Sequence, residues 1–251
     1  MTFNTLDLFC GCGGFTTGLT EAGLNIVAGI DIWDKAIASY GSNHHHLAIC
    51  ADLTCLSPEQ FSQDYKIPEI DILVGSCPCQ SFSMAGKRDK NDPRNSLFME
   101  YVKYLNFYKP KAFLFENVMG MLSKKTAQGE NVIDIIMSYM EVEYNCIITK
   151  LYAKDFEVPQ KRRRVIIIGI RKDLDIIPTE PKPLGFIIPT STVLLPRDQV
   201  DQKYYLSERA ITGIQRKKEA MAEKGYGFGA QIIDPDKECY TIPCRYFKDG
   251  Y

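Results

Sequence analysis

The chain has 251 residues, of which 45% are apolar and 24% are charged. This apolar content is sufficient for the core of one large domain, with room for a smaller second region. The formal net charge of -1 excludes a strongly basic nucleic-acid-binding protein of the histone kind, but it is compatible with a local basic face.

No signal peptide is predicted, because the first residues, MTFNTLDLFC, lack a basic start and a long apolar run. No later run approaches the roughly 20 apolar residues of a membrane-spanning helix. The nine cysteines are odd in number and scattered, which favours reduced thiols in a soluble, cytoplasmic protein without membrane contact. Zinc ligands could come from Cys10, Cys12, Cys77, Cys79 and the histidines at 44–46. Because the usual C-x-x-C spacing is absent, no metal is predicted.

Seven short apolar runs have the composition of β-strands, and segments with helical apolar spacing separate them. The predicted strands are residues 5–9, 25–31, 47–50, 70–75, 112–116, 146–152 and 164–170. This alternation predicts an α/β fold, with a mostly parallel sheet and helices on both faces. Prolines interrupt the pattern after residue 177. We therefore predict a domain over residues 1–178, followed over 179–251 by a linker and a region that does not form a closed domain.

Ligands of a parallel sheet bind beyond the carboxyl ends of its strands. After the first predicted strand, Gly11, Gly13 and Gly14 permit a tight turn and the close approach of a ligand to the backbone. Asp31 ends the second strand, where a carboxylate can accept hydrogen bonds from both ribose hydroxyls. Asp52 follows the third strand and could bind an adenine amino group. Each feature alone also fits a structural turn or a helix cap, but the three in order predict a nucleoside-containing cofactor.

The fourth and fifth predicted strands lead to groups that a core does not need. Cys79 follows a proline at the end of the fourth strand, where its thiol would be open to a ligand, although a structural cysteine remains the alternative. Glu116 ends the fifth strand. The run QKRRR leads into the seventh strand and brings Gln160, Arg162 and Arg164 towards the same edge. A thiol, a carboxylic acid and two alternating arginines at one edge indicate a catalytic site.

Four motifs in this order resemble those of the cytosine-5 methyltransferase family: DLFCGCGGF, PCQSFS, ENV and QKRRR. The resemblance covers about residues 5–170 and implies a Rossmann-like, S-adenosylmethionine-dependent methyltransferase fold. Carried over by position, the cofactor contacts are Phe9, Gly11, Gly13, Asp31, Ile32, Asp52 and Leu97. The implied catalytic residues are the nucleophile, the acid that holds a ring nitrogen, and two supporting arginines: Cys79, Glu116, Arg162 and Arg164. The expected substrate contacts are Gln80, Ser83, Lys87, Arg88, Asn117 and Gln160.

The resemblance implies methyl transfer to carbon 5 of a cytosine that is flipped out of double-stranded DNA, through a covalent adduct with Cys79. It also suggests a role in a restriction-modification system. The segment 81–94 is too polar for a core and is expected to close over the flipped base, with Lys87 and Arg88 near phosphates.

The region after residue 178 does not show two further motifs that family members normally carry, one of which includes a Gly-Asn pair. One subunit of a split enzyme, which needs a second polypeptide with those motifs, is therefore expected, with a truncated product or a fragment as alternatives. Two other functions remain open. The chain could bind the cofactor without turnover of its own, or it could methylate transfer RNA with the same core motifs.

Overall fold

The computed structural model describes residues 2–78, 97–126, 129–225 and 232–242. These residues fall into two compact units, Met1–Leu151 with Arg163–Pro181, and Tyr152–Arg162 with Lys182–Tyr251. The second unit thus takes up the short segment Tyr152–Arg162 in addition to the C-terminal part of the chain. The roles predicted for residues 1–178 and 179–251 remain predictions, and the two units are described separately below.

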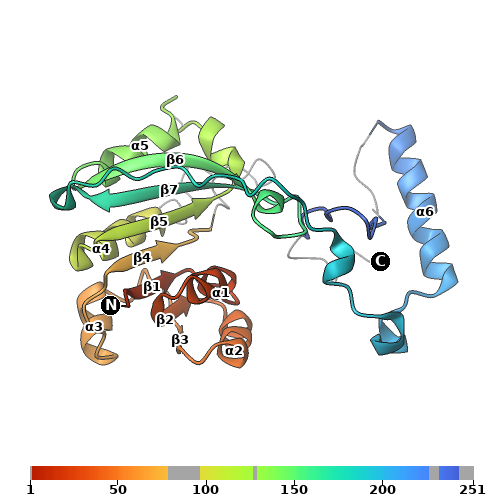
Figure 1. Cartoon of the computed structure of the whole chain (residues 1–251), viewed down its shortest axis with the longest axis horizontal. Coiled ribbons are helices and arrows are strands. Elements are labelled where there is room, and N and C mark those ends of the chain that lie inside the picture. The colour runs from red at the N-terminus through yellow and green to blue at the C-terminus, as the bar shows by residue number, and fades with distance from the viewer. Residues whose placement is uncertain (1, 79–96, 127–128, 226–231, 243–251) are drawn as a thin grey trace. The chain divides into compact units, whose positions relative to one another are not determined.

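The first unit contains a seven-stranded sheet with the order β3-β2-β1-β4-β5-β7-β6 (Figure 1). Its strands are β1 (Asn4–Leu8), β2 (Asn25–Asp31), β3 (Leu47–Cys50), β4 (Ile72–Gly75), β5 (Ala112–Asn117), β6 (Tyr144–Tyr152) and β7 (Arg163–Arg171). All seven predicted strands are present, with small shifts at their ends. The pairs β1–β2, β1–β4, β2–β3 and β4–β5 are parallel, and β5–β7 is antiparallel. The prediction of a mostly parallel sheet is confirmed.

The antiparallel direction of β7 determines where the arginine run lies. Asn117, the last residue of β5, pairs with Val165 near the start of β7. The start of β7 therefore lies at the carboxyl end of β5, beside Glu116. A parallel β7 would have placed Arg164 at the opposite edge of the sheet.

Helices cover both faces of the sheet, as predicted. They are α1 (Gly14–Glu21), α2 (Asp34–Asn43), α3 (Pro58–Asp64), α4 (Leu97–Tyr108) and α5 (Val132–Met140). Side chains of α3, α4 and α5 share one core with Leu6 and Leu8 of β1. Leu19 of α1 packs with Ile26 and Val74 in a separate cluster. Successive side chains of a strand point to opposite faces, so on β4 Leu73 belongs to the first cluster and its neighbour Val74 to the second.

The second unit contains α6 (Glu208–Glu223) and short 3-10 segments, with little regular pairing among its described residues. The Ser207 side chain caps α6 by accepting a hydrogen bond from Ala210 N at 3.3 Å. No residue of α6 is buried. Gln160 forms a single parallel bridge with Cys239, and Thr190 donates from its hydroxyl to Lys237 O at 2.6 Å.

Within the described ranges, no helix is both long and apolar enough to cross a membrane.

Candidate active site

The turn between β1 and α1 contains three residues with positive φ: Phe9 at 57°, Gly11 at 55° and Gly13 at 92°. A Cβ at Gly13 would overlap the ring of His44, which explains the need for glycine there. At Gly11, by contrast, a Cβ would meet no atom of the described residues within 4 Å. The backbone at Gly11 is therefore open on the side from which a ligand could approach.

Asp31 joins the end of β2 to this turn. Its Oδ2 accepts a hydrogen bond from Gly11 N at 2.9 Å, and its Oδ1 accepts one from Trp33 N at 2.9 Å. Because each carboxylate oxygen has two lone pairs, both oxygens retain capacity for a further donor. The two side chains that follow Asp31 in sequence are apolar and exposed: Ile32 is 66% exposed and Trp33 is 57% exposed. Asp31 can therefore accept hydrogen bonds from the hydroxyls of a ribose. The two exposed apolar side chains can contact the aromatic ring of an attached base.

Asp52 lies in the segment that follows β3. Its Oδ1 accepts hydrogen bonds from Thr54 N at 2.9 Å and from Thr54 Oγ1 at 2.8 Å, so it stabilises a local turn. Ala51 N donates to Asp31 O at 3.0 Å, which brings this segment beside the end of β2. Leu97 begins α4 and packs against the main core. Cofactor contacts at Asp52 and Leu97 remain predictions.

Asp7 is a buried acid beneath the turn that the sequence analysis did not identify. Its Oδ2 accepts a hydrogen bond from Thr16 Oγ1 at 2.8 Å, and Thr16 also lies 3.1 Å from Tyr40 Oη. Its Oδ1 is buried and has no hydrogen-bond partner within the described part of the chain. Burial raises the pKa of Asp7 to about 7. In the sequence, Asp7 could have been noticed as an acid between two leucines of a predicted strand.

Trp33 is a second residue that the sequence analysis did not identify. It is the single tryptophan of the chain, and it lies two residues after Asp31, to which its backbone N–H is bonded. Its exposure next to an acid at a strand end could have marked it as a candidate for stacking on a ligand ring.

Glu116 and Arg164 form an ion pair at the carboxyl edge of the sheet. Arg164 Nε lies 2.5 Å from Glu116 Oε1, and the side chains are 22% and 17% exposed, respectively. Burial on this scale limits solvent screening of the pair. The antiparallel pairing of β7 with β5 brings these two predicted catalytic residues together, and the arginine fixes the orientation of the carboxylate.

The exit of β4 leads from the sheet towards residue 79. The Ser76 hydroxyl donates to Phe9 O at 2.8 Å. Cys77 is buried, and its carbonyl oxygen accepts a hydrogen bond from Asn117 Nδ2 at 3.5 Å. Asn117 Oδ1 accepts one from Val118 N at 2.8 Å. Asn117 is only 1% exposed, so these bonds direct its amide to the β4 exit, and a substrate contact there remains a prediction.

Five predicted site residues lie outside the described residues, and their roles remain predictions: Cys79, Gln80, Ser83, Lys87 and Arg88. Two others, Gln160 and Arg162, belong to the second unit. Within that unit, the carbonyl oxygen of Arg162 accepts a hydrogen bond from Ala153 N at 2.8 Å. The contacts predicted for Gln160 and Arg162 with a base also remain predictions.

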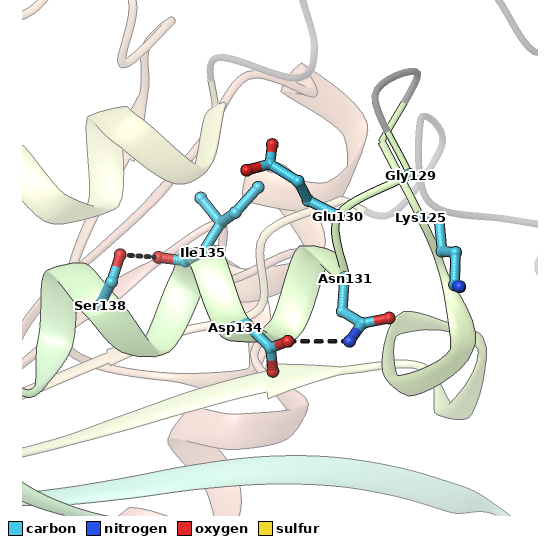
Figure 2. A pocket seen from close by; sticks show the side chains of 7 residues that line it. All are labelled: Lys125, Gly129, Glu130, Asn131, Asp134, Ile135 and Ser138. Atoms are coloured by element: carbon cyan, nitrogen blue, oxygen red, sulfur yellow. Dashed lines mark hydrogen bonds between the residues drawn. The ribbon is translucent and has the colours of Figure 1, made fainter.

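A pocket at the start of α5 contains none of the predicted site residues (Figure 2). It is lined by Lys125, Gly129, Glu130, Asn131, Asp134, Ile135 and Ser138. Asn131 Nδ2 donates to Asp134 Oδ2 at 2.8 Å, and Ser138 Oγ donates to Ile135 O at 2.7 Å. Its two acidic side chains outnumber its one lysine, and nothing connects this pocket with the predicted reaction.

The described cysteines are all free thiols. Among the residues that the structure describes, no group of three histidine, cysteine, aspartate or glutamate side chains is arranged to hold a metal ion. Cys79, one of the zinc ligands considered above, lies outside this part of the chain. The expectation of a protein without a metal remains a prediction.

Comparisons with known proteins identify the family of the chain. Residues 3–249 match the family model of the C-5 cytosine-specific DNA methylases. The type II methyltransferase M.DdeI of Desulfomicrobium norvegicum is 38% identical over 215 residues, which cover 84% of this chain and 48% of that protein. The type II methyltransferase M.NlaX of Neisseria lactamica is 32% identical over 99% of this chain and 77% of that protein.

The solved structure of the Entamoeba histolytica methyltransferase EhMeth has the same fold, with a TM-score of 0.72. It is 19% identical, and the match covers 99% of this chain and 73% of that one. The chain spans about half the length of M.DdeI and about three quarters of M.NlaX. The family match over nearly all of its residues shows that the chain belongs to the C-5 cytosine-specific DNA methylases, which use S-adenosylmethionine as their methyl donor.

Proposed function

We propose that the chain carries the catalytic chemistry of a DNA cytosine-5 methyltransferase, which acts on carbon 5 of cytosine in double-stranded DNA. The observation that carries the proposal is the Glu116–Arg164 ion pair, which lies at the edge where β4 leads towards Cys79 in the motif PCQ. In a chain of this family, an oriented carboxyl at this edge suits a reaction in which a thiol and a carboxyl act together.

The turn between β1 and α1, which we call the cofactor turn, fits S-adenosylmethionine. The open side of Gly11 permits close approach to the backbone, and Asp31 offers oriented acceptors for the ribose hydroxyls. Exposed Ile32 offers an apolar surface for the adenine ring. When bound, S-adenosylmethionine supplies the methyl group that carbon 5 receives. Phe9, Gly13, Asp52 and Leu97 complete the proposed set of cofactor contacts.

Carbon 5 of cytosine is a weak nucleophile, and the proposed catalytic residues make it more nucleophilic. Cys79 adds as a thiolate to carbon 6 and forms a carbon–sulfur bond, which pushes electron density towards carbon 5. An ordinary thiol with a pKa of about 8.5 is only about 3% ionised at neutral pH, so nearby cations assist. Glu116 binds the ring nitrogen where negative charge develops, and Arg164 holds Glu116 in place. When a base removes the proton from carbon 5, the carbon–sulfur bond breaks and Cys79 leaves.

Carbon 6 cannot be reached inside a stacked duplex, so the target nucleotide must leave the helix. Lys87 and Arg88 are proposed to contact phosphates, and Gln80, Ser83 and Gln160 to contact the displaced nucleotide. Arg162 is proposed to support the base together with Arg164. A cytoplasmic restriction-modification system is the proposed setting, because the two relatives above are type II methyltransferases.

The test is methylation of duplex DNA with radiolabelled S-adenosylmethionine by the parent chain and its Cys79→Ser variant. Where the parent methylates DNA, alone or with the C-terminal part of a relative added, we expect Cys79→Ser neither to methylate it nor to form a covalent adduct with DNA that contains 5-fluorocytosine. Cys146→Ser is the matched control, because Cys146 is a free thiol on β6 and should be dispensable. Comparable methylation by Cys79→Ser would refute the proposed nucleophile. Methylation of transfer RNA in place of duplex DNA would overturn the proposed substrate.

A second candidate is activity that depends on additional sequence, supplied as a second polypeptide. The observation that favours it is the span of this chain, which covers 48% of M.DdeI. The same methylation assay, repeated after addition of the C-terminal part of a relative, distinguishes the two. Activity that appears only after this addition supports a dependence on the second polypeptide, and full activity without the addition excludes that dependence. Cofactor binding without methylation under both conditions would indicate a non-catalytic subunit.

A further inference from the structure

The exit of β4 is bonded to both neighbouring strands in the sheet, β1 and β5 (Figure 1). On the β1 side, the Ser76 hydroxyl donates to Phe9 O at 2.8 Å, and Ser76 N donates to Leu8 O at 3.2 Å. On the β5 side, Asn117 Nδ2 donates to Cys77 O at 3.5 Å. These bonds connect the cofactor turn, the segment that leads to Cys79, and the strand that carries the acid.

The peptide group between Phe9 and Cys10 is held from two sides. Its oxygen accepts the hydrogen bond from Ser76, and its N–H donates to Ile30 O of β2 at 3.0 Å. Because a peptide group is planar, these two bonds fix the orientation of the whole plane. The next N–H along the chain, that of Gly11, donates to Asp31 Oδ2 at 2.9 Å, so the two successive peptide groups of the turn are both hydrogen-bonded.

This orientation requires support, because Phe9 has a φ of 57°. Residues with a Cβ rarely adopt such a backbone conformation, and it persists only where the surroundings hold it. The Ser76 hydroxyl donates to the carbonyl group of this strained residue, and Ser76 lies directly after β4, 67 residues away from Phe9 in sequence.

We propose that Ser76 is a positioning residue for the cofactor turn, which it holds in the conformation that binds S-adenosylmethionine. The inference rests on the proposed function and deepens it, because it names the group that preorganises the cofactor site. Without the hydroxyl, the turn populates other conformations. The apparent affinity for the cofactor then falls in proportion to the fraction of chains with a competent turn.

The test is binding of S-adenosylhomocysteine, measured by calorimetry, to the parent chain and to Ser76→Ala. We expect about fivefold weaker binding, the effect of losing one typical intramolecular hydrogen bond. The amides of Cys10 and Gly11 should exchange hydrogen faster in the variant. The KM for S-adenosylmethionine should rise while kcat changes little. Ser138→Ala is the matched control, because it removes a hydroxyl-to-carbonyl bond in α5 (Figure 2) and should leave the affinity unchanged.

Ser76→Thr keeps the hydroxyl and should retain most of the parental affinity, which separates the hydrogen bond from a general effect on folding. Parental affinity and exchange rates in Ser76→Ala would overturn the inference, as would an equal loss in Ser138→Ala. If Ser76→Thr binds S-adenosylhomocysteine as weakly as Ser76→Ala, the inference is also overturned. If the parent chain itself binds no S-adenosylhomocysteine, the result refutes the proposed function on which the inference rests. If the parent binds S-adenosylhomocysteine and Ser76→Ala binds it equally well, only the inference about Ser76 is refuted.

Discussion

Asp31 allows a direct test of the proposed cofactor site, because both of its carboxylate oxygens are engaged. They accept hydrogen bonds from Gly11 N and Trp33 N, each at 2.9 Å. Asp31→Ala removes these acceptors and those proposed for the ribose hydroxyls. Hydrogen bonds to charged groups contribute about 1.5–3 kcal/mol each, so the loss of even one should weaken cofactor binding by at least about tenfold.

The assay is calorimetric titration with S-adenosylhomocysteine, together with a thermal melt that verifies folding. Asp31→Asn should bind with intermediate affinity, because its amide nitrogen cannot accept the hydrogen bond of one of the two backbone donors. Asp34→Asn changes the net charge equally at the first residue of α2 and should alter the affinity by less than about twofold. A folded Asp31→Ala chain with the affinity of the parent would refute the reasoning.

Arg164→Gln removes the Nε donor that lies 2.5 Å from Glu116 Oε1, so kcat for methylation should fall roughly 10- to 100-fold with unchanged S-adenosylhomocysteine affinity. Arg171→Gln breaks a similar pair with Asp173 at the other end of β7, and an equal loss of kcat there would contradict the role of Arg164. Burial raises the pKa of Asp7 from 3.8 to about 7, so the folded chain holds this proton more tightly than the unfolded chain. The resulting stability is fully present below about pH 4 and is lost as the pH rises through about 7, by up to roughly 4 kcal/mol. Urea denaturation of Asp7→Asn should lack this dependence, and identical pH profiles for parent and variant would count against it.

The strands and the cofactor turn could be predicted from sequence because short-range patterns determine them. Apolar runs bounded by turn residues indicated all seven strands, and their alternation with helical spacing indicated helices on both faces. Gly13 is needed because its φ is 92° and because a Cβ there would overlap the ring of His44. The glycines of the motif DLFCGCGGF therefore indicate the turn. Glu116 and Asp31 could be proposed as site residues because a strand end is recognisable from its own residues, and their roles remain predictions.

The direction of β7 and the contacts between strands were decided only by the tertiary structure. An apolar run has the same composition in either direction, so the sequence of β7 does not reveal the antiparallel pairing that brings Arg164 to Glu116. The bonds from Asp31 to Gly11, and from Ser76 to Phe9, join residues that are 20 and 67 positions apart. The burial that raises the pKa of Asp7 likewise comes from helices packed over β1. Such contacts depend on how the strands and helices assemble, because hydrogen bonding and desolvation act between groups that are close in space, whatever their separation in the chain.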